Sequence, residues 1–293
     1  MSRISPKKLL QRSITILLLA PLIVGVILFD MQPYGALPFL VFIISITVMS
    51  LNEYFHMSHT DNEPFFLTGH VLCVGLVLLA FFREAAPFWN SGIIKIVTGL
   101  ILVFFLTELN LKKMFKPSNK LYVSIKGVLY IGWFYSYFIL IRNLKYGKEL
   151  IFYVMFTIWS LDIMAYLVGM TIGKHRLSPE ISPKKSIEGA IGGFVAAIVM
   201  SFLLISGYVH QFLPSKIGYY LSAHVGIGHS IILGAIIGLL GQSGDLYESL
   251  IKRTYKVKDS SNILPGHGGI MDRADSFILL APVVYYYLAA LIV

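Results

Sequence analysis

Residues 228–275 hold the stretch that decides the fold, which reads GHSIILGAIIGLLGQSGDLYESLIKRTYKVKDSSNILPGHGGIMDRAD. Its first part, 228–249, is an apolar run about as long as the roughly 20 residues that a helix needs to cross a bilayer. Its second part, 249–275, is in turn basic, glycine-rich and acidic. We therefore expect a membrane-spanning helix that leads directly into a ligand-binding loop.

The loop contains the residue types that bind phosphate and a divalent cation. Its basic residues, which can donate charge-assisted hydrogen bonds to phosphate oxygens, are Lys252, Arg253, Lys256 and Lys258. Gly266, Gly268 and Gly269 let the backbone approach a ligand and offer N–H groups to anions. Asp272 and Asp275 carry the hard oxygens that Mg²⁺ takes when it is shared with a nucleotide. A basic loop that contacts anionic lipid heads is the alternative, but the glycines and aspartates favour a phosphate and metal site.

The composition is that of an integral membrane protein. The chain is 56% hydrophobic and 13% charged, with a mean hydropathy of +0.75, whereas soluble domains have about 25% charged residues. Apolar runs of spanning length lie near 13–29, 37–55, 67–83, 92–109, 122–141, 150–172, 187–209, 228–249 and 276–293. These runs predict an all-α protein with about nine transmembrane helices.

The two halves of the chain differ in character. Residues 1–150 are mostly plain apolar spans, so we expect a set of N-terminal membrane helices there. Residues 151–293 bring polar and small residues into the spans, which predicts a C-terminal bundle carrying the catalytic motifs on its cytoplasmic side. Small residues four apart, which let helix backbones approach closely, occur at Gly169/Gly173, Gly189/Gly193 and Gly234/Gly238.

The distribution of positive charge predicts the orientation. Most of the 24 lysines and arginines fall at the N-terminus and near 112–120, 174–185 and 250–275. The positive-inside rule then places the N-terminus and the loop in the cytoplasm and, with nine spans, the C-terminus outside. We expect a multi-pass protein of the plasma (inner) membrane. The basic net charge of +9 does not indicate nucleic-acid binding, because the loops lack interleaved aromatic and base-reading residues.

An aspartate stands near the middle of one predicted span. An ionised carboxylate there costs about 2.5–3.5 kcal/mol, so Asp162 is expected to face a site or a water-filled cavity. The 3.6-residue period puts Tyr166, Gly169 and Gly173 on the same face. A buried hydrogen bond to a neighbouring helix is the alternative explanation.

The segment ISPKKSIEG at 181–189 predicts an anion site at the start of a helix. We expect the helix to begin near Ser182, because Pro183 is tolerated in a first turn. The hydroxyl and lysine side chains that would meet an anion there are Ser182, Lys184, Lys185 and Ser186. A plain capping motif with anchoring lysines is equally compatible with these residues.

A further acidic group ends the span before the loop. Asp245, Glu248, Ser249 and Lys252 recur at helical spacing on one face. Two carboxylates beside hydrocarbon are costly unless a cation is present. Asp162, Asp245 and Asp272 could then converge from three elements that face the cytoplasm.

Other titratable residues receive simpler interpretations. Glu53 and Glu108 lie near cytoplasmic helix ends, where we expect solvation. His267 is expected to be exposed by its glycine neighbours and to donate to a phosphate. Cys73 is the single cysteine, which excludes disulfides within the chain and a cysteine-based zinc site.

The loop closely resembles the signature of the CDP-diacylglycerol synthases (phosphatidate cytidylyltransferases). The fixed positions of that signature are met by Ser249, Lys252, Arg253, Lys258, Asp259, His267, Gly268, Gly269, Asp272, Arg273 and Asp275. Ala274 departs from it, because the family usually has a larger side chain there, and this concerns packing rather than chemistry. The segment from Ser182 to Gly189 is similar to a second family element. The resemblance is strong over about 155–280 and weak in the N-terminal half.

The resemblance implies transfer of the cytidylyl group of CTP to phosphatidate with release of pyrophosphate. Under it, the catalytic candidates are Lys252, Arg253, His267 and Arg273. The substrate-binding candidates are Asp162, Ser182, Lys184, Lys185, Ser186, Lys258, Gly268 and Gly269. The candidate ligands for Mg²⁺ are Asp245, Glu248, Asp272 and Asp275, with a second cation and a homodimer left open.

Two other functions are compatible with the composition. A CTP-using polyprenol or phytol kinase of related build lacks the full H-G-G-x-x-D-R-x-D element. A transporter could use Asp162 and Asp245 for a cation pathway, but the two halves show no matching interrupted helices. The full element therefore favours the cytidylyltransferase.

Overall fold

The computed structural model of the chain describes residues 6–31, 35–59, 64–82, 87–112, 120–206 and 225–292, and it is predominantly helical there. The elements before residue 143 are α1 (Pro6–Leu28), α2 (Leu37–Met57), α3 (Pro64–Phe81), η1 (Pro87–Asn90), α4 (Gly92–Asn110), α5 (Lys120–Gly127), the π-helical turn η2 (Val128–Trp133) and α6 (Phe134–Arg142). Those that follow are α7 (Gly147–Thr171), β1 (Arg176–Ser178), β2 (Ser182–Ser186), α8 (Ile187–Ile205), α10 (Ile227–Thr254), α11 (Met271–Ile278) and α12 (Ala281–Ile292). The prediction of an all-α protein is confirmed apart from one short hairpin.

Membrane-spanning helices account for most of the described chain. Six of the described helices are long and apolar enough to cross a bilayer, or seven if α11 and α12 form one bent span. The six are Leu37–Met57, Gly92–Asn110, Lys120–Arg142, Gly147–Thr171, Ile187–Ile205 and Ile227–Thr254. Shorter apolar helices occupy Leu17–Leu28 and Phe65–Phe81. A multi-pass membrane protein is thus confirmed, while nine crossings and the side of each terminus stay predictions.

The last apolar run does not form one straight helix. α11 and α12 meet at a bend of 45°, where the sequence predicts a single span over 276–293. Pro282 lies in the first turn of α12. Proline has no N–H to donate to the carbonyl four residues earlier, that of Ile278, and its ring clashes with that carbonyl, so α11 cannot continue straight into α12.

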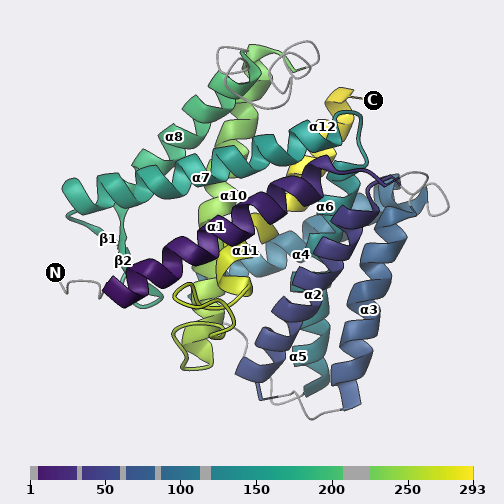
Figure 1. Cartoon of the computed structure of the whole chain (residues 1–293), viewed down its shortest axis with the longest axis horizontal. Helices are drawn as coiled ribbons and strands as arrows, with labels where there is room; N and C mark the ends of the chain where they lie inside the picture. Colours follow the sequence, from purple (N-terminus) through teal and green to yellow (C-terminus); the bar gives the residue numbers. More distant parts are fainter. Residues whose placement is uncertain are drawn as a thin grey trace. The chain divides into compact units, whose positions relative to one another are not determined.

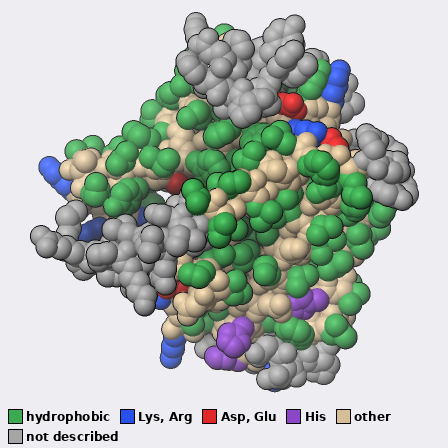
Figure 2. All heavy atoms as spheres, viewed as in Figure 1, with side chains coloured by type: hydrophobic (Ala, Val, Ile, Leu, Met, Phe, Trp, Pro, Cys, Tyr) green, Lys and Arg blue, Asp and Glu red, His purple; other side chains and the backbone are tan. Residues whose placement is uncertain are grey.

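Apolar side chains face outward on the spans, as lipid contact requires. They cover much of the surface visible in Figure 2, with few charged side chains between them. Strongly exposed examples lie on several helices, at Leu67, Ile93, Leu100 and Ile191. α4 is the least enclosed of the six spans, with 17% of its apolar window buried, against 78% for Lys120–Arg142.

The chain divides into two compact units that do not follow the order of the sequence. Unit 1 comprises Met1–Ala86, Phe115–Ile139 and Ile251–Ala274. Unit 2 comprises Pro87–Met114, Leu140–Leu250 and Asp275–Val293. The functional division into 1–150 and 151–293 stays a prediction, because compactness does not say which segments carry the chemistry.

Unit 1 packs α2 and α3 beside the helix formed by α5 and η2 (Figure 1). Glycines let these helices approach closely. A Cβ atom added at Gly127 would lie 2.8 Å from the ring of Tyr54, and one at Gly132 would lie 2.5 Å from Sγ of Cys73. The π-helical turn η2 contains Gly132.

Unit 2 is organised around α7 and α8, which lie side by side and are joined by the β1–β2 hairpin (Figure 1). A Cβ atom at Gly189 would lie 2.6 Å from the carbonyl oxygen of Ala165, and one at Gly193 would lie 2.8 Å from that of Leu161. A Cβ atom at Gly234 of α10 would lie 2.6 Å from Cα of Ile198. The close approach predicted from the glycine spacings is therefore confirmed.

This packing predicts that Gly193→Ala destabilises the protein. The added methyl group has no space against the α7 backbone, and overpacking of this kind costs about 1–3 kcal/mol. Thermal unfolding in detergent should begin several degrees lower. Gly99→Ala is the matched control in α4, because nothing lies within 4 Å of its Cβ position. Equal midpoints for the two variants would contradict the close contact.

Candidate functional site

The glycine-rich loop of unit 1 closes on itself between α10 and α11. Leu264 N donates to the carbonyl oxygen of Gly268 at 2.9 Å, and His267 N donates to that of Leu264 at 2.9 Å. Gly266 and Gly268 have φ angles of +76° and +83°, a region that favours glycine. A Cβ atom at Gly268 would also lie 2.7 Å from Oδ2 of Asp272. The turn therefore requires glycine for both conformation and space.

Asp272 is held by donors from the loop and from α10. Lys252 Nζ lies 2.6 Å from Oδ1, and Oδ2 accepts from Gly269 N at 2.8 Å and Ser260 N at 2.9 Å. The Ser260 hydroxyl lies 2.9 Å from the same oxygen. The side chains of Asp272 and Lys252 are only 5% and 12% exposed. Burial of two charges is costly, and their contact with several hydrogen bonds offsets that cost.

Glu53 of α2 is a member of this network that the sequence did not reveal. It is 3% exposed, whereas we expected it to be solvated, so that prediction is wrong. Its carboxylate accepts from Ser260 Oγ at 2.8 Å, Ser261 Oγ at 2.6 Å, Ile270 N at 2.8 Å and Met271 N at 2.8 Å. The available signal was a carboxylate within an apolar run, the reasoning that singled out Asp162.

Glu108 of α4 is also buried, contrary to its expected solvation. It is 0% exposed, and Tyr247 OH donates to its Oε2 at 2.6 Å within unit 2. The ring of Phe105 packs edge-on against Tyr247 with centroids 5.1 Å apart. A tyrosine partner on another helix replaces water here, and sequence spacing gives no sign of that partner.

The Ser-Pro-Lys-Lys segment forms a strand and not the first turn of a helix. β2 pairs antiparallel with β1, and α8 begins at Ile187 with Ser186 as its N-cap. Ser186 Oγ accepts from Gly189 N at 3.1 Å. The predicted helix start near Ser182 is wrong because Pro183 favours extended geometry at the residue before it. The lysines therefore lie on the strand that leads into the helix.

Lys185 of this strand forms an ion pair in unit 2. Its Nζ lies 2.5 Å from Oδ2 of Asp245 on α10, and both side chains are less than a third exposed. Asp275 lies within electrostatic reach of Asp245, Lys185 and Asp162. A Cβ atom at Gly244 would collide with the backbone carbonyl of Asp275, so α10 and α11 approach closely here. Unit 2 thus gathers Asp275 with Asp162 and Asp245, whereas Asp272 belongs to unit 1.

The other predicted residues differ in exposure. Exposed side chains belong to Asp162, Lys184, Arg253, Lys258 and Arg273. His267 is half-buried and not exposed as expected, and Glu248 is fully buried. Ser182 is half-buried on β2. Among the described residues, no group of three or more His, Cys, Asp or Glu side chains is arranged to hold a metal ion. The proposed metal ligands therefore stay predictions.

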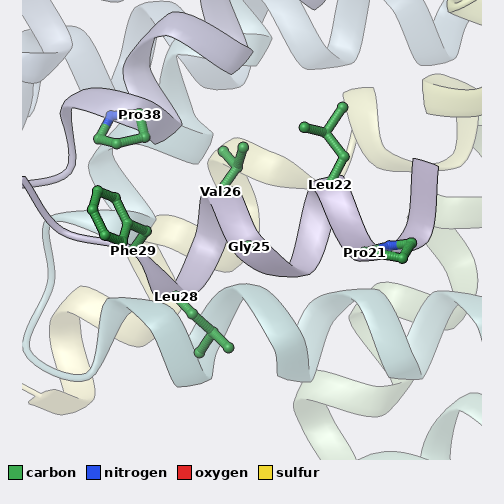
Figure 3. Close-up of a pocket in the computed structure, with 7 residues that line it drawn as sticks. All are labelled: Pro21, Leu22, Gly25, Val26, Leu28, Phe29 and Pro38. Atoms are coloured by element: carbon green, nitrogen blue, oxygen red, sulfur yellow. The ribbon is translucent and has the colours of Figure 1, made fainter. Parts of the chain in front are cut away.

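A separate apolar groove of about 570 Å³ is lined by residues of α1, of its connection to α2 and of the first turn of α2 (Figure 3). Its lining consists of Pro21, Leu22, Gly25, Val26, Leu28, Phe29 and Pro38. None of these residues offers a charge or a polar side chain, so the groove suits hydrocarbon and not a polyanion. The charged clusters of the two units are the better candidates for the site.

Comparisons with known proteins match nearly the whole chain. The sequence model of the cytidylyltransferase family matches residues 10–291. A phosphatidate cytidylyltransferase of Bacillus subtilis (strain 168) is 39% identical over 261 residues, which cover 87% of this chain and 90% of the relative. The phosphatidate cytidylyltransferase of Staphylococcus aureus (strain COL) is 30% identical over 85% and 89% of the two chains. That of Staphylococcus haemolyticus (strain JCSC1435) is 31% identical over 71% and 74%.

The geometry of the loop predicts that Gly269→Ala displaces it. The added methyl group would collide with Ser260 Oγ and would lie 2.5 Å from Oε2 of Glu53. Local opening of the loop should speed tryptic cleavage after the exposed Lys256 and Lys258, as followed by mass spectrometry of the purified protein. Gly75→Ala is the control, because nothing lies within 4 Å of its Cβ position. Unchanged cleavage in Gly269→Ala would contradict the tight docking.

Proposed function

Because the chain belongs to the cytidylyltransferase family, we propose that it transfers the cytidylyl group of CTP to phosphatidate, which gives CDP-diacylglycerol and pyrophosphate in phospholipid biosynthesis. The observation that carries this is 39% identity to a phosphatidate cytidylyltransferase over 90% of that relative. The same match argues against the kinase and the transporter. The protein is a CTP-dependent nucleotidyltransferase of the membrane.

The reaction requires charge neutralisation more than a strong base. A phosphate oxygen of phosphatidate attacks the α-phosphorus of CTP, and the bond from that phosphorus to the bridging oxygen of the β-phosphate breaks. A phosphate monoester has a second pKa of about 6, so phosphatidate is largely dianionic at neutral pH and can attack directly. The protein must align the two anions and neutralise the leaving pyrophosphate.

The cluster of unit 2 supports a role in cation and phosphate binding. Two carboxylates, on Asp245 and Asp275, interact there unfavourably with each other, with Lys185 nearby. Their hard oxygens fit Mg²⁺, which would neutralise charge on the phosphate oxygens when bound. We propose these two as ligands, with the buried Glu248 as a further candidate. Lys184, which is exposed beside Lys185, would donate to phosphate together with Ser182 and Ser186. Asp162 on α7 completes the proposed substrate-binding set as an acceptor or through a bound cation.

Asp272 fits a metal less well in this arrangement. Its oxygens already accept from Lys252, Ser260 and Gly269, and hydrogen-bond donors surround it where a cation would have to sit. Ligation by Asp272 would require Lys252 to move toward another anion, such as a phosphate. We therefore propose that Asp272 positions Lys252, and that it would be available to hold a metal only with that lysine turned toward a substrate phosphate.

The basic side chains of unit 1 suit contact with a polyanion. Arg253, Lys258 and Arg273 are exposed, and each can give charge-assisted hydrogen bonds of the kind that hold phosphates. His267 and the backbone at Gly268 and Gly269 complete the proposed set.

The proposal places the site at the cytoplasmic face of the plasma membrane. CTP is a cytoplasmic solute that cannot cross hydrocarbon, while the tails of phosphatidate stay in the bilayer. The N-terminus would lie inside and the C-terminus outside, in line with the positive-inside rule. A homodimer, which crosslinking in membranes can test, stays part of the proposal.

The proposed reaction predicts release of pyrophosphate that requires CTP, phosphatidate and Mg²⁺ together. Asp245→Asn should lower kcat about a hundredfold or more, because the charge stabilisation from a bound metal is worth several kcal/mol. Glu108→Gln, a substitution of a buried carboxylate paired with Tyr247, is the control and should stay near the wild-type rate. No pyrophosphate from the wild type would refute the function, and a normal rate in Asp245→Asn would remove this residue from the metal site.

The proposed orientation predicts which introduced cysteines an impermeant thiol reagent can reach in intact cells. The exposed positions Lys145, Glu180 and Asn262 are each replaced by cysteine in a Cys73→Ala background. Only the cysteine at 145 should label, because it follows a span that ends outside. Labelling at 262 from outside would place the loop away from CTP and would defeat the proposed mechanism.

A further inference from the structure

Glu53 belongs to none of the motifs to which the function is attributed. It lies near the end of α2, in an apolar run, and its side chain is almost fully buried. A carboxylate removed from water keeps its charge only if protein groups replace the lost hydrogen bonds. The groups that do so all come from residues more than 200 positions further along the chain.

Two of these donors are backbone N–H groups at the start of α11. Ile270 N and Met271 N lie 2.8 Å from the two carboxylate oxygens of Glu53. The first N–H groups of a helix have no partner within it, and the helix dipole favours a negative charge at that end. Glu53 therefore fixes where α11, the helix that carries Asp272, begins.

The other two donors connect Glu53 to the ion pair of the loop. Ser261 Oγ donates to Oε1 at 2.6 Å. Ser260 Oγ lies 2.8 Å from Oε2 of Glu53 and 2.9 Å from Oδ2 of Asp272. A hydroxyl carries one proton and so must share it between the two carboxylates. A shift of Glu53 would thus be felt at Asp272 and at its partner Lys252.

α2 also contacts the beginning of the loop. The ring of Tyr54 meets that of Tyr255 edge-on, with centroids 6.3 Å apart. The neighbouring residues Glu53 and Tyr54 therefore hold the loop at its end and at its start. The loop is packed tightly against Glu53 at Gly269, because a Cβ atom there would collide with Ser260 and lie 2.5 Å from the Glu53 carboxylate.

We infer that Glu53 is a positioning residue for the transfer reaction: its carboxylate clamps residues 260–271 so that Asp272, and the Lys252 side chain that it holds, stand where the substrates meet them. This inference rests on the proposed function. Glu53 itself is buried behind the loop and is not assigned a contact with substrate.

The test compares Glu53→Gln with Glu108→Gln in purified, detergent-solubilised protein. The amide keeps the volume of Glu53 but turns an NH₂ group toward donors, so two of its four hydrogen bonds lose their acceptor. We expect a folded protein whose kcat falls about tenfold to a hundredfold, as a displacement of about 1 Å can cause, while KM for CTP and for phosphatidate stays within about threefold. Glu108→Gln places the same change at another buried site and should keep kcat.

A second measurement reports on the loop without using activity. A cysteine at the exposed position 262, in a Cys73→Ala background, should react severalfold faster with a soluble thiol reagent when Glu53→Gln is present, because the loop opens more often. A cysteine at 180 in unit 2 should not change. The inference is overturned if folded Glu53→Gln keeps kcat within twofold, if KM alone changes, or if labelling at 262 is unaltered. Absence of pyrophosphate release by the wild type would reject the proposed function alone, since faster labelling would still establish the clamp.

Discussion

Hydrocarbon offers a polypeptide no hydrogen-bond partner, and this constraint governs the whole protein. Each backbone N–H and C=O within the bilayer must be paired internally, which leaves helices as the local structure of a chain with this composition. Because lipid is as apolar as leucine, helices associate through close packing and not through exclusion of water. The glycines at 189, 193 and 234 therefore carry the contacts between the helices of unit 2.

The same constraint decides what charged side chains can do. Three buried carboxylates have protein partners in place of water: Glu53 has the loop, Glu108 has Tyr247, and Asp272 has Lys252. Under the proposed function, donors already arranged around these carboxylates would need little reorganisation when the substrates arrive.

Lys252–Asp272 and Lys185–Asp245 are ion pairs with a shared consequence for binding. A lysine that already forms an ion pair with a carboxylate is fixed in position. A phosphate must therefore compete with that carboxylate for the lysine. The competing charge is large for a triphosphate and smaller for a single phosphate monoester. Under the proposed function, both pairs would therefore favour a ligand that carries several negative charges, such as the triphosphate of CTP.

The sequence by itself determined the membrane class, the helical nature of the apolar runs and the family, because hydropathy, glycine spacing and motif chemistry are local properties of the chain. Only the tertiary structure decided that Glu53 and Glu108 are buried, that Asp275 joins Asp162 and Asp245, and that Lys185 pairs with Asp245. Those facts depend on which segments meet in space. Glu53 and Met271 are separated by 218 positions, and no periodicity connects residues so far apart. The start of α8 and the bend before α12 were missed for a different reason, since a proline can either begin a helix or prevent one, and only the neighbouring hydrogen bonds decide between the two.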